Sequence, residues 1–401
     1  MSIKERNITK WVLLLFTPVI SFFVSLYDAY EKNSRLILIL FCGLAGWLMF
    51  PYNTDLDLYE YYDYIISQGE PNEYVYLSGL YDYLSFDTNI KDYYFETVVF
   101  YVGQITSNIH FIFLVFGLVY GFFFATSMGV ITKEIEASGN KTYSIYLLII
   151  LFITMPFTNI SSVRFWTSAW MAICICLKVL VEKKYLYLLF TPLLIFIHGS
   201  YLIFIVILGA TLLIRRIPRI NSALTLLVYL SIPLSFLSLY VGEALYDYLP
   251  TPLQHTADYY LSDENLARKT LQGSGFSFVT SIFRMLVTVF KYILIVLLLH
   301  RRRSMSDKYS SIQTLTLLLL AFSLFMMGIP SLGGRFFNVV IPLVVYLWIC
   351  TFKSNEYKQL VYLTPFVYSF DMIYWVYYYV KGTTGIIQLF MPPLISIVQF
   401  L

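Results

Sequence analysis

Long apolar segments separated by short polar connections occupy most of the chain. Judged by apolar length, about thirteen segments begin near residues 11, 36, 109, 143, 165, 185, 200, 222, 278, 312, 336, 360 and 385. Segments of this length and composition are typical of helices that cross a bilayer. The pattern therefore predicts an all-α polytopic membrane protein with about 12–13 membrane segments in a single transmembrane domain, residues 1–401.

One apolar run, from Tyr185 to Ile214, is too long for a single straight crossing. Roughly 30 residues of helix would extend about 45 Å, against a hydrocarbon core of about 30 Å. His198-Gly199-Ser200 is the natural break. Because lipid cannot satisfy the backbone groups freed at such a turn, we expect it to line a water-filled cavity within the protein. The sequence thus predicts a broken mid-membrane helix pair over 185–214, with a titratable imidazole at its turn.

Composition agrees with this fold class, since 59% of the residues are hydrophobic and 13% are charged. The net charge of +3 is too small to indicate nucleic acid as a partner. A basic amino terminus precedes an apolar stretch that is followed at once by a second, which argues against a cleavable signal peptide. All four cysteines lie within apolar segments, which favours neither a metal site nor a disulfide.

Basic residues in the connections predict the orientation. From Arg215 onward, one side carries Arg215, Arg216, Arg219, Arg301, Arg302, Arg303, Lys308, Lys353 and Lys358, and the other carries Arg268, Lys269, Arg335 and Lys381. The first side is therefore predicted to be cytoplasmic. In the first half, a break at His198 places Lys32, Arg35, Lys133, Lys141, Lys183 and Lys184 inside, against Lys91, Arg164 and three terminal residues. Treating the first ten residues as mobile favours this arrangement, with an external amino terminus. An unbroken run would instead place Arg164 in the cytoplasm.

Two long connections are predicted to be external. Residues 52–108 are acidic and rich in tyrosine, and residues 242–277 contain a Gly273-Ser274-Gly275 hinge. Loops of this length are uncommon unless they are functional. We expect them to lie over the membrane as short interfacial helices, with 95–109 forming one such helix or a re-entrant piece. Most of the tyrosines fit an interfacial belt, but a ring with a hydroxyl also suits sugar binding.

Two apolar segments open with an arginine on the predicted external side. Arg164 lies within Asn159-Ile160-Ser161-Ser162-Val163-Arg164-Phe165-Trp166-Thr167, where a serine is a candidate helix cap, and Arg335 lies within Ser331-Leu332-Gly333-Gly334-Arg335-Phe336-Phe337-Asn338. Free N–H groups at a helix start attract anions, and the guanidinium fork matches phosphate, so the pair suits a diphosphate. Arg284 lies deeper in an apolar segment and needs a partner. The structural alternative is that Arg164 and Arg335 anchor the interface and that Arg284 pairs with Asp371.

Acidic residues and histidines supply the remaining candidate chemistry. Asp55 and Asp57 follow the second apolar segment at the predicted external surface, where a carboxylate can orient or deprotonate a sugar hydroxyl. His198 is the other candidate base, and the choice between His198 and Asp57 stays open. His110, His255 and His300 lie at segment ends or in a connection. No nucleophile motif, phosphate-binding loop or zinc spacing is found, which favours a metal-free transfer from a preactivated donor.

The order of these motifs resembles the EpsG-like branch of Wzy-type polysaccharide polymerases over nearly the whole chain. It consists of an Asp-rich motif ending at Asp57, then Val163-Arg164-Phe165-Trp166, then His198-Gly199-Ser200, then Gly334-Arg335-Phe336, with Phe165 in place of the usual glutamine. The resemblance implies a membrane glycosyltransferase of GT-C-like architecture in the bacterial inner membrane. Such an enzyme moves a growing chain from undecaprenyl diphosphate to an incoming repeat unit at the outer face.

The predicted site combines these motifs. Its candidate catalytic residues are His198, Asp57, Arg164 and Arg335, and its candidate substrate-binding residues are Arg164, Arg335, Arg284, Asp55, Tyr61, Tyr62, Trp166 and Thr167. The implied partners are the lipid-linked donor and acceptor, membrane lipid, and a chain-length regulator and flippase of the same pathway, without cofactor, metal or nucleic acid. The alternatives are a lipid-linked glycan ligase, a membrane O-acyltransferase and a flippase or other transporter. A transporter would predict an internal repeat and a through-going polar path, and the sequence shows no repeat.

Overall fold

The described part of the chain is built of helices, and no strand is found in it. The computed structural model describes residues 3–51, 57–69, 71–85, 92–138, 141–248, 254, 278–301, 307–329, 332–352, 356–382, 388–398 and 400. Within these ranges, 5 helices are long and apolar enough to cross a membrane, or up to 6 if one bent pair counts as a single span. The predicted all-α polytopic membrane fold is confirmed. Several of the thirteen predicted segments are instead short helices or arms of bent runs.

Helices α3 (Lys32–Trp47) and α7 (Ile109–Ser138) form the centre of the fold and run antiparallel in close contact. Glycine permits this approach, because a Cβ at Gly46 would collide with the carbonyl oxygen of Phe113, and one at Gly117 with that of Cys42. At one end of the pair, His110 Nδ1 lies 2.7 Å from the carbonyl oxygen of Trp47. This contact ties the end of α3 to the start of α7.

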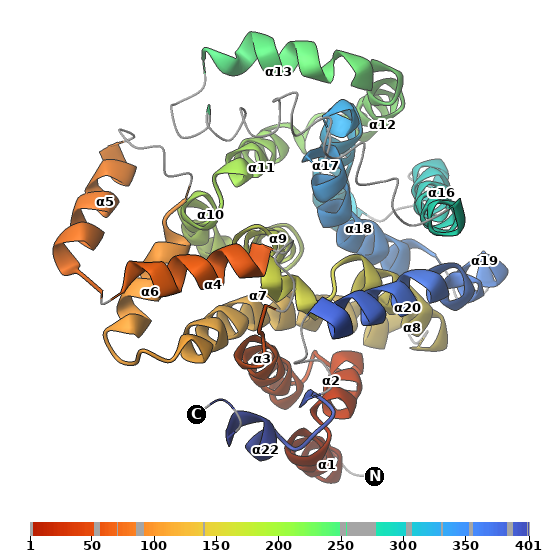
Figure 1. Cartoon of the computed structure of the whole chain (residues 1–401). Helices are drawn as coiled ribbons and strands as arrows, with labels where there is room; N and C mark the ends of the chain where they lie inside the picture. The colour runs from red at the N-terminus through yellow and green to blue at the C-terminus, as the bar shows by residue number, and fades with distance from the viewer. Residues whose placement is uncertain are drawn as a thin grey trace.

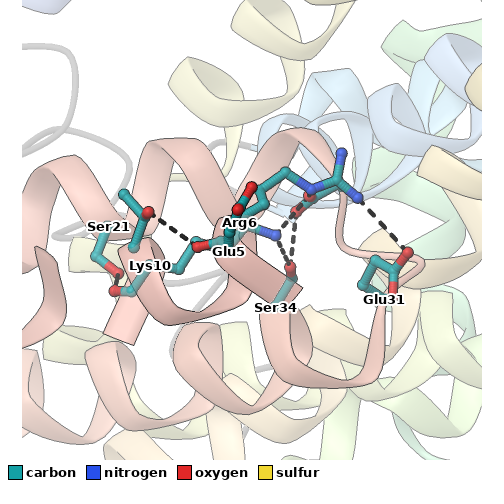
Figure 2. A network of polar contacts seen from close by, with 8 residues as sticks. Glu5, Arg6, Lys10, Ser21, Glu31 and Ser34 are labelled. Carbon is teal, nitrogen blue, oxygen red and sulfur yellow. Dashed lines mark hydrogen bonds and ion pairs between the residues drawn. The ribbon is translucent and has the colours of Figure 1, made fainter. Parts of the chain in front are cut away.

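The amino-terminal residues are ordered, and they lie where the sequence analysis did not place them. The first predicted span is two helices, α1 (Ile3–Phe16) and α2 (Pro18–Tyr27), separated at Thr17 before the helix-starting proline. Figure 2 shows the polar network around Lys10 that joins them to α3. Within it, Lys10 forms a buried ion pair with Asp28. Arg6 also contacts Glu31 at 3.7 Å. Residues 3–10, which the sequence analysis treated as mobile, are therefore part of a packed helix. The amino terminus lies at the same end as Asp28 and the start of α3.

The next apolar run, Tyr143–Val181, is 39 residues long and turns back on itself. It contains α8 (Lys141–Thr154), η1 (Phe157–Ser162), α9 (Val163–Cys176) and η2 (Leu177–Val181). The Tyr120 hydroxyl of α7 donates to the Pro156 carbonyl at 3.0 Å and accepts from Trp170 Nε1 at 2.8 Å. A straight helix would separate these two residues by about 21 Å. The chain therefore reverses at η1, as the two predicted segments near 143 and 165 require.

The run 185–214 is broken at His198, which confirms the prediction. Its parts are η3 (Tyr185–Phe190), α10 (Thr191–Ile197), η4 (Gly199–Tyr201) and α11 (Leu202–Ile214). His198 has extended backbone angles, φ −160 and ψ 112, between the two arms. The Phe196 carbonyl accepts a hydrogen bond from the Tyr93 backbone N–H at 3.0 Å. The turn therefore lies beside the segment that precedes α7.

Charged contacts gather at the opposite end of α7. Lys308 pairs with Glu134 at 2.8 Å, and Arg301 pairs with Glu356 at 3.0 Å. Arg35 packs against Gly129 of α7. The end that holds Arg35, Arg301 and Lys308 is called the basic end below.

The remaining helices surround this centre. Between α3 and α7 lie three short helices, α4 (Asp57–Gln68), α5 (Glu73–Ser85) and α6 (Tyr94–Gly103). The second half contains α12 (Ile220–Ser231), η5 (Pro233–Leu237), α13 (Ser238–Tyr246), α16 (Phe278–Arg301), η7 (Asp307–Tyr309), α17 (Ser310–Phe325), η8 (Met326–Gly328), α18 (Leu332–Thr351), α19 (Lys358–Tyr362), α20 (Thr364–Gly382) and α22 (Pro393–Val398). Figure 1 shows α5 and α13 at the edge of the molecule, and α22 beside α1. Most of the predicted connection 242–277 lies outside the described residues.

Candidate functional site

Arg164 is held at the start of α9 by groups from two other parts of the chain. Its Nη1 atom lies 3.1 Å from Asp92 Oδ1, and its Nε atom donates to the Tyr61 hydroxyl at 3.2 Å. The guanidinium also lies over the Tyr61 ring, 5.3 Å from its centroid. Asp92 is buried, whereas the Arg164 side chain is 34% exposed. The arginine is therefore anchored from one side and accessible from another.

Asp57 begins α4 and faces the same helix start. Its Oδ2 atom accepts a hydrogen bond from Ser162 Oγ at 2.7 Å, and the pair is exposed. Ser162 is the N-cap residue of α9, but its side chain makes no capping hydrogen bond to that helix. The serine hydroxyl, a candidate cap in the sequence, instead links α4 to α9. This hydrogen bond holds the Asp57 carboxylate at Ser162, which precedes Arg164 by two residues.

Phe165 joins the other predicted residues to this site. The Arg335 guanidinium lies over the Phe165 ring, 5.4 Å from its centroid. The His198 ring meets the same phenyl ring at 5.3 Å in an edge-on arrangement, with an interplanar angle of 85°. The start of α18, the turn at His198 and the start of α9 thus converge on one aromatic side chain. Arg335 and Arg164 consequently lie at the same end of the molecule, opposite the basic end.

The hydrogen bonds of His198 indicate the state of its ring. The backbone N–H of Ser200 donates to His198 Nδ1 at 3.3 Å, and Ser200 Oγ lies 2.9 Å from the same nitrogen. A backbone N–H can only donate, so Nδ1 is the acceptor and a neutral ring carries its hydrogen on Nε2.

Burial shifts two titratable groups near Arg164. Burial raises the pKa of Tyr61 to about 12, although the positive charge of Arg164 acts in the opposite direction. Burial, together with the negative charge of Asp92, raises the pKa of Glu96 in α6 to about 7. Tyr61 therefore stays neutral near neutral pH and acts as a hydrogen-bonding group. Glu96 titrates in that range.

The other predicted substrate-binding residues have different surroundings. The Tyr62 hydroxyl donates to the Met49 carbonyl at 2.7 Å, which makes it part of the packing between α4 and α3. Trp166 is half-buried against Phe165. The Thr167 side chain is buried, and its hydroxyl finds no hydrogen-bond partner in the described ranges. Asp55 lies outside the described residues.

Arg284 belongs to a different group of charges. It is exposed on α16, and its charge acts on the carboxylate of Asp371 in α20, as does that of Lys291. Lys291 also donates to Asn338 Oδ1 of α18 at 3.1 Å. The proposed pairing of Arg284 with Asp371 thus has a structural basis.

Sequence reasoning missed three residues at this site. In the sequence, Asp92 and Glu96 are two acids among many in the connection 52–108. Phe165 stands out only because it replaces the glutamine that is usual at this position in the EpsG-like pattern. A signal for Glu96 was available, since it is an acid in the first turn of an otherwise apolar helix. Nothing in the sequence pairs either acid with Arg164, because 72 residues separate Asp92 from Arg164.

The sequence of this chain is similar to that of one known protein family. The sequence profile of the EpsG family matches residues 34–391. No protein of curated function and no solved structure gives a significant match. In the described residues, no group of three or more His, Cys, Asp and Glu side chains is arranged to hold a metal ion. The profile match includes every candidate site residue described above, and it excludes α1 and α2.

Proposed function

We propose, because this chain belongs to the EpsG family, that it polymerises oligosaccharide repeat units carried on undecaprenyl diphosphate. Family membership supports a polysaccharide polymerase of glycosyltransferase type. The observation that carries the finer proposal is the convergence of Arg164, Arg335 and His198 around Phe165. Two arginines at two helix starts suit a diphosphate, whose negative charge grows as the glycosidic bond to it breaks.

The proposed reaction is a transfer of the growing chain to the incoming unit. An acceptor hydroxyl oxygen attacks the anomeric carbon of the chain, the bond from that carbon to the diphosphate breaks, and the lipid diphosphate departs with the electron pair. Arg164 and Arg335 stabilise the charge on the leaving group. The hydroxyl proton passes to a base at the site.

Asp57 is the better candidate for this base. Its carboxylate is exposed beside the start of α9, whereas the Nδ1 atom of His198 accepts from the Ser200 backbone N–H and a neutral ring then carries its hydrogen on Nε2. His198 is suited to donate that hydrogen to an oxygen of the substrate. The sequence left the choice between His198 and Asp57 open, and these hydrogen bonds favour Asp57 as the base.

The two roles are tested by paired substitutions. Asp57→Asn keeps the shape but not the basicity, so chain extension should fall by roughly 10²–10⁴-fold while donor binding is retained. His198→Gln restores a donor near the position of Nε2 and should keep more activity than His198→Ala. Asp63→Asn, at an exposed acid of the same helix, is the matched control. Full loss in His198→Gln with normal extension by Asp57→Asn would reverse the two roles.

The proposed location is the bacterial inner membrane, with the site end outside. The support is the distribution of basic residues, since Arg6 and Lys10 lie with Arg35, Arg301 and Lys308 at the end opposite the site. In a variant without the four native cysteines, a cysteine at exposed Tyr74 of α5 should react with a membrane-impermeant thiol reagent in intact cells. A cysteine at exposed Lys184 should not react. The opposite labelling pattern would refute the orientation.

Deletion in the native host tests the proposed function as a whole. Loss of a polymerase should leave surface glycans of a single repeat unit, whereas loss of a flippase should leave none. Arg164→Lys and Arg335→Lys should fail to restore long glycans although the protein reaches the membrane, because lysine keeps the charge but lacks the fork that matches phosphate. Full-length glycans from both variants would make these arginines interfacial anchors.

A further inference from the structure

Glu96 adds a second carboxyl group beside the pair formed by Arg164 and Asp92. It lies in the first turn of α6, four residues after Asp92, which precedes that helix, and the charges of Asp92 and Arg164 both act on it. Its Oε2 atom is enclosed by protein, and no hydrogen-bond donor is found for that atom in the described residues. An ionised carboxylate is costly in such a place.

We propose that Glu96 takes up a proton when a diphosphate binds at Arg164, so that anion binding and protonation of Glu96 are linked. The inference rests on the proposed function, since it takes the diphosphate to bind at this arginine. In the free protein, Arg164 offers one positive charge to the carboxyl groups of Asp92 and Glu96. A bound diphosphate adds negative charge at the same guanidinium. Like charges disfavour one another, and Glu96 can relieve the excess by becoming neutral.

The surroundings of Glu96 support the view that Glu96, and not a neighbouring group, takes up the proton. Asp92 is paired directly with Arg164, its Oδ1 atom lying 3.1 Å from Nη1. The other titratable groups on which the charge of Glu96 acts are Tyr64 of α4, Tyr83 of α5, and Tyr93. Their pKa values are all raised, chiefly by burial, so these phenols stay neutral near pH 7. From α9 the facing charge is Arg164, and α10 contributes the backbone carbonyl of Phe196 next to Tyr93.

The direction of the linkage follows from the free-state pKa of Glu96, about 7. Binding raises it further, so affinity for the anion is greatest below pH 7 and falls as the pH rises towards the pKa of the bound state. At pH 8 the free carboxyl group is about 10% protonated, and binding should take up as much as about 0.9 proton. At pH 7 the uptake should be about 0.5 proton, because half of the free protein is already protonated.

Calorimetry of the full chain in nanodiscs measures this uptake directly. Farnesyl diphosphate is the probe, titrated at pH 8 in two buffers of different ionisation enthalpy. The dependence of the binding enthalpy on the buffer gives the number of protons exchanged. The probe itself also exchanges protons on binding. Wild type is therefore compared with Glu96→Gln, because the probe contributes the same number of protons in both proteins. Glu60→Gln, at an exposed acid of α4, is the matched control.

The expected result is an uptake in wild type and in Glu60→Gln that exceeds that of Glu96→Gln by about 0.9 proton. Glu96→Gln should also bind at pH 8 up to about tenfold more tightly than wild type, since it carries no charge to remove. Equal uptake in all three proteins, with binding that is lost in Arg164→Ala, would refute the role of Glu96 and leave the diphosphate site intact. Absence of binding by wild type, or binding that does not depend on Arg164, would refute the linkage and the proposed diphosphate site together.

The pH dependence of affinity is a second measurement of the linkage. The affinity of wild type for farnesyl diphosphate can be followed from pH 6 to pH 8.5, with inorganic pyrophosphate as a probe that lacks the prenyl chain. A loss of affinity above pH 7 for both probes supports a linkage at the anion itself. The pH dependence of Glu96→Gln, which contains the titration of the probe alone, is subtracted. A wild-type affinity that shows no additional loss above pH 7 after this subtraction would overturn the proposal.

Discussion

Two ion pairs with a buried carboxylate occupy opposite ends of this molecule and differ in how fully they are enclosed. At the basic end, the Lys10 side chain is 0% exposed and Asp28 is 3% exposed. Asp28 also accepts from Ser34 at 2.6 Å, and Arg6 lies 3.4 Å from it. At the site end, Asp92 is equally buried, but its partner Arg164 is 34% exposed.

The comparison separates a closed network from an open one. Lys10, Asp28 and Ser34 are buried and hydrogen-bond one another within the network of Figure 2, whereas Arg6 at its rim is 36% exposed. The closed part of the network is therefore the Lys10–Asp28–Ser34 group. Around Arg164 one face of the cation is available, and a nearby carboxylate oxygen of Glu96 has no donor in the described ranges. A fully paired, buried network contributes to the stability of the fold, whereas a partly exposed arginine can still bind an anionic ligand.

The largest effect is expected from breaking the closed pair. Asp28→Ala leaves Lys10 buried without its counter-ion, which should lower the free energy of unfolding by about 3–5 kcal/mol. The variant should accumulate poorly in the membrane and unfold at lower temperature in detergent. Both quantities can be measured by fluorescence of a carboxy-terminal fusion and by a thermal shift.

A double substitution provides the control. Replacing both charges, as in Lys10→Met with Asp28→Leu, should restore most of the stability, because well-packed apolar groups often replace a buried ion pair at little cost. Normal accumulation of the single variant Asp28→Ala would show that this network is not closed in the membrane.

The corresponding change at the open pair should spare the fold. In Asp92→Asn the exposed face of Arg164 keeps its hydration, so the free energy of unfolding should change by about 1 kcal/mol or less. Chain extension should fall by about tenfold, since a charged hydrogen bond that orients the guanidinium is lost. Thermal shifts and polymer length measured on the same preparation separate the two effects. A loss of stability equal to that of Asp28→Ala would remove the distinction between the pairs.

The smallest effect is expected at Tyr61. Tyr61→Phe keeps the ring beneath the guanidinium and removes only the hydroxyl that accepts from Arg164 Nε at 3.2 Å. A hydrogen bond of this kind contributes about 1 kcal/mol, which corresponds to about fivefold weaker binding of farnesyl diphosphate. The matched control is Tyr64→Phe, at a neighbouring ring that packs on Phe95. An effect above that size would mean that the hydroxyl contacts the ligand itself.

The fold was largely predictable because the thickness of a bilayer limits how long an apolar helix that crosses it can be. That argument identified the break at His198 and the separate arms that meet at η1. It failed at the amino terminus, where Lys10 was treated as part of a mobile solvated segment. A buried lysine needs a partner, and Asp28 becomes one only because the chain turns at Thr17. Such a turn has no signature in apolar length.

The sequence pointed to the arginines of the candidate site, but not to the contacts that surround them. Arginine at a helix start is visible in the sequence, and both helices do begin near their arginines. The pairing of Arg164 with Asp92 and the stacking of Arg335 on Phe165 depend on contacts between distant segments. Residue spacing along one helix carries no information about such contacts, so Asp92, Glu96 and Phe165 became visible only in three dimensions.

The contact between His110 and Trp47 has a consequence for the chain entropy of the site. It joins residues 63 positions apart and so closes the whole connection that carries Asp57, Tyr61, Asp92 and Glu96 into a loop. Closing a flexible loop of that length costs about 4 kcal/mol by the logarithmic dependence on length alone. The packing of α3 on α7 offsets that cost at a distance from the site. The connection that carries these four side chains therefore has both of its ends already fixed. Their own weak contacts near the start of α9 need only select one conformation of this connection.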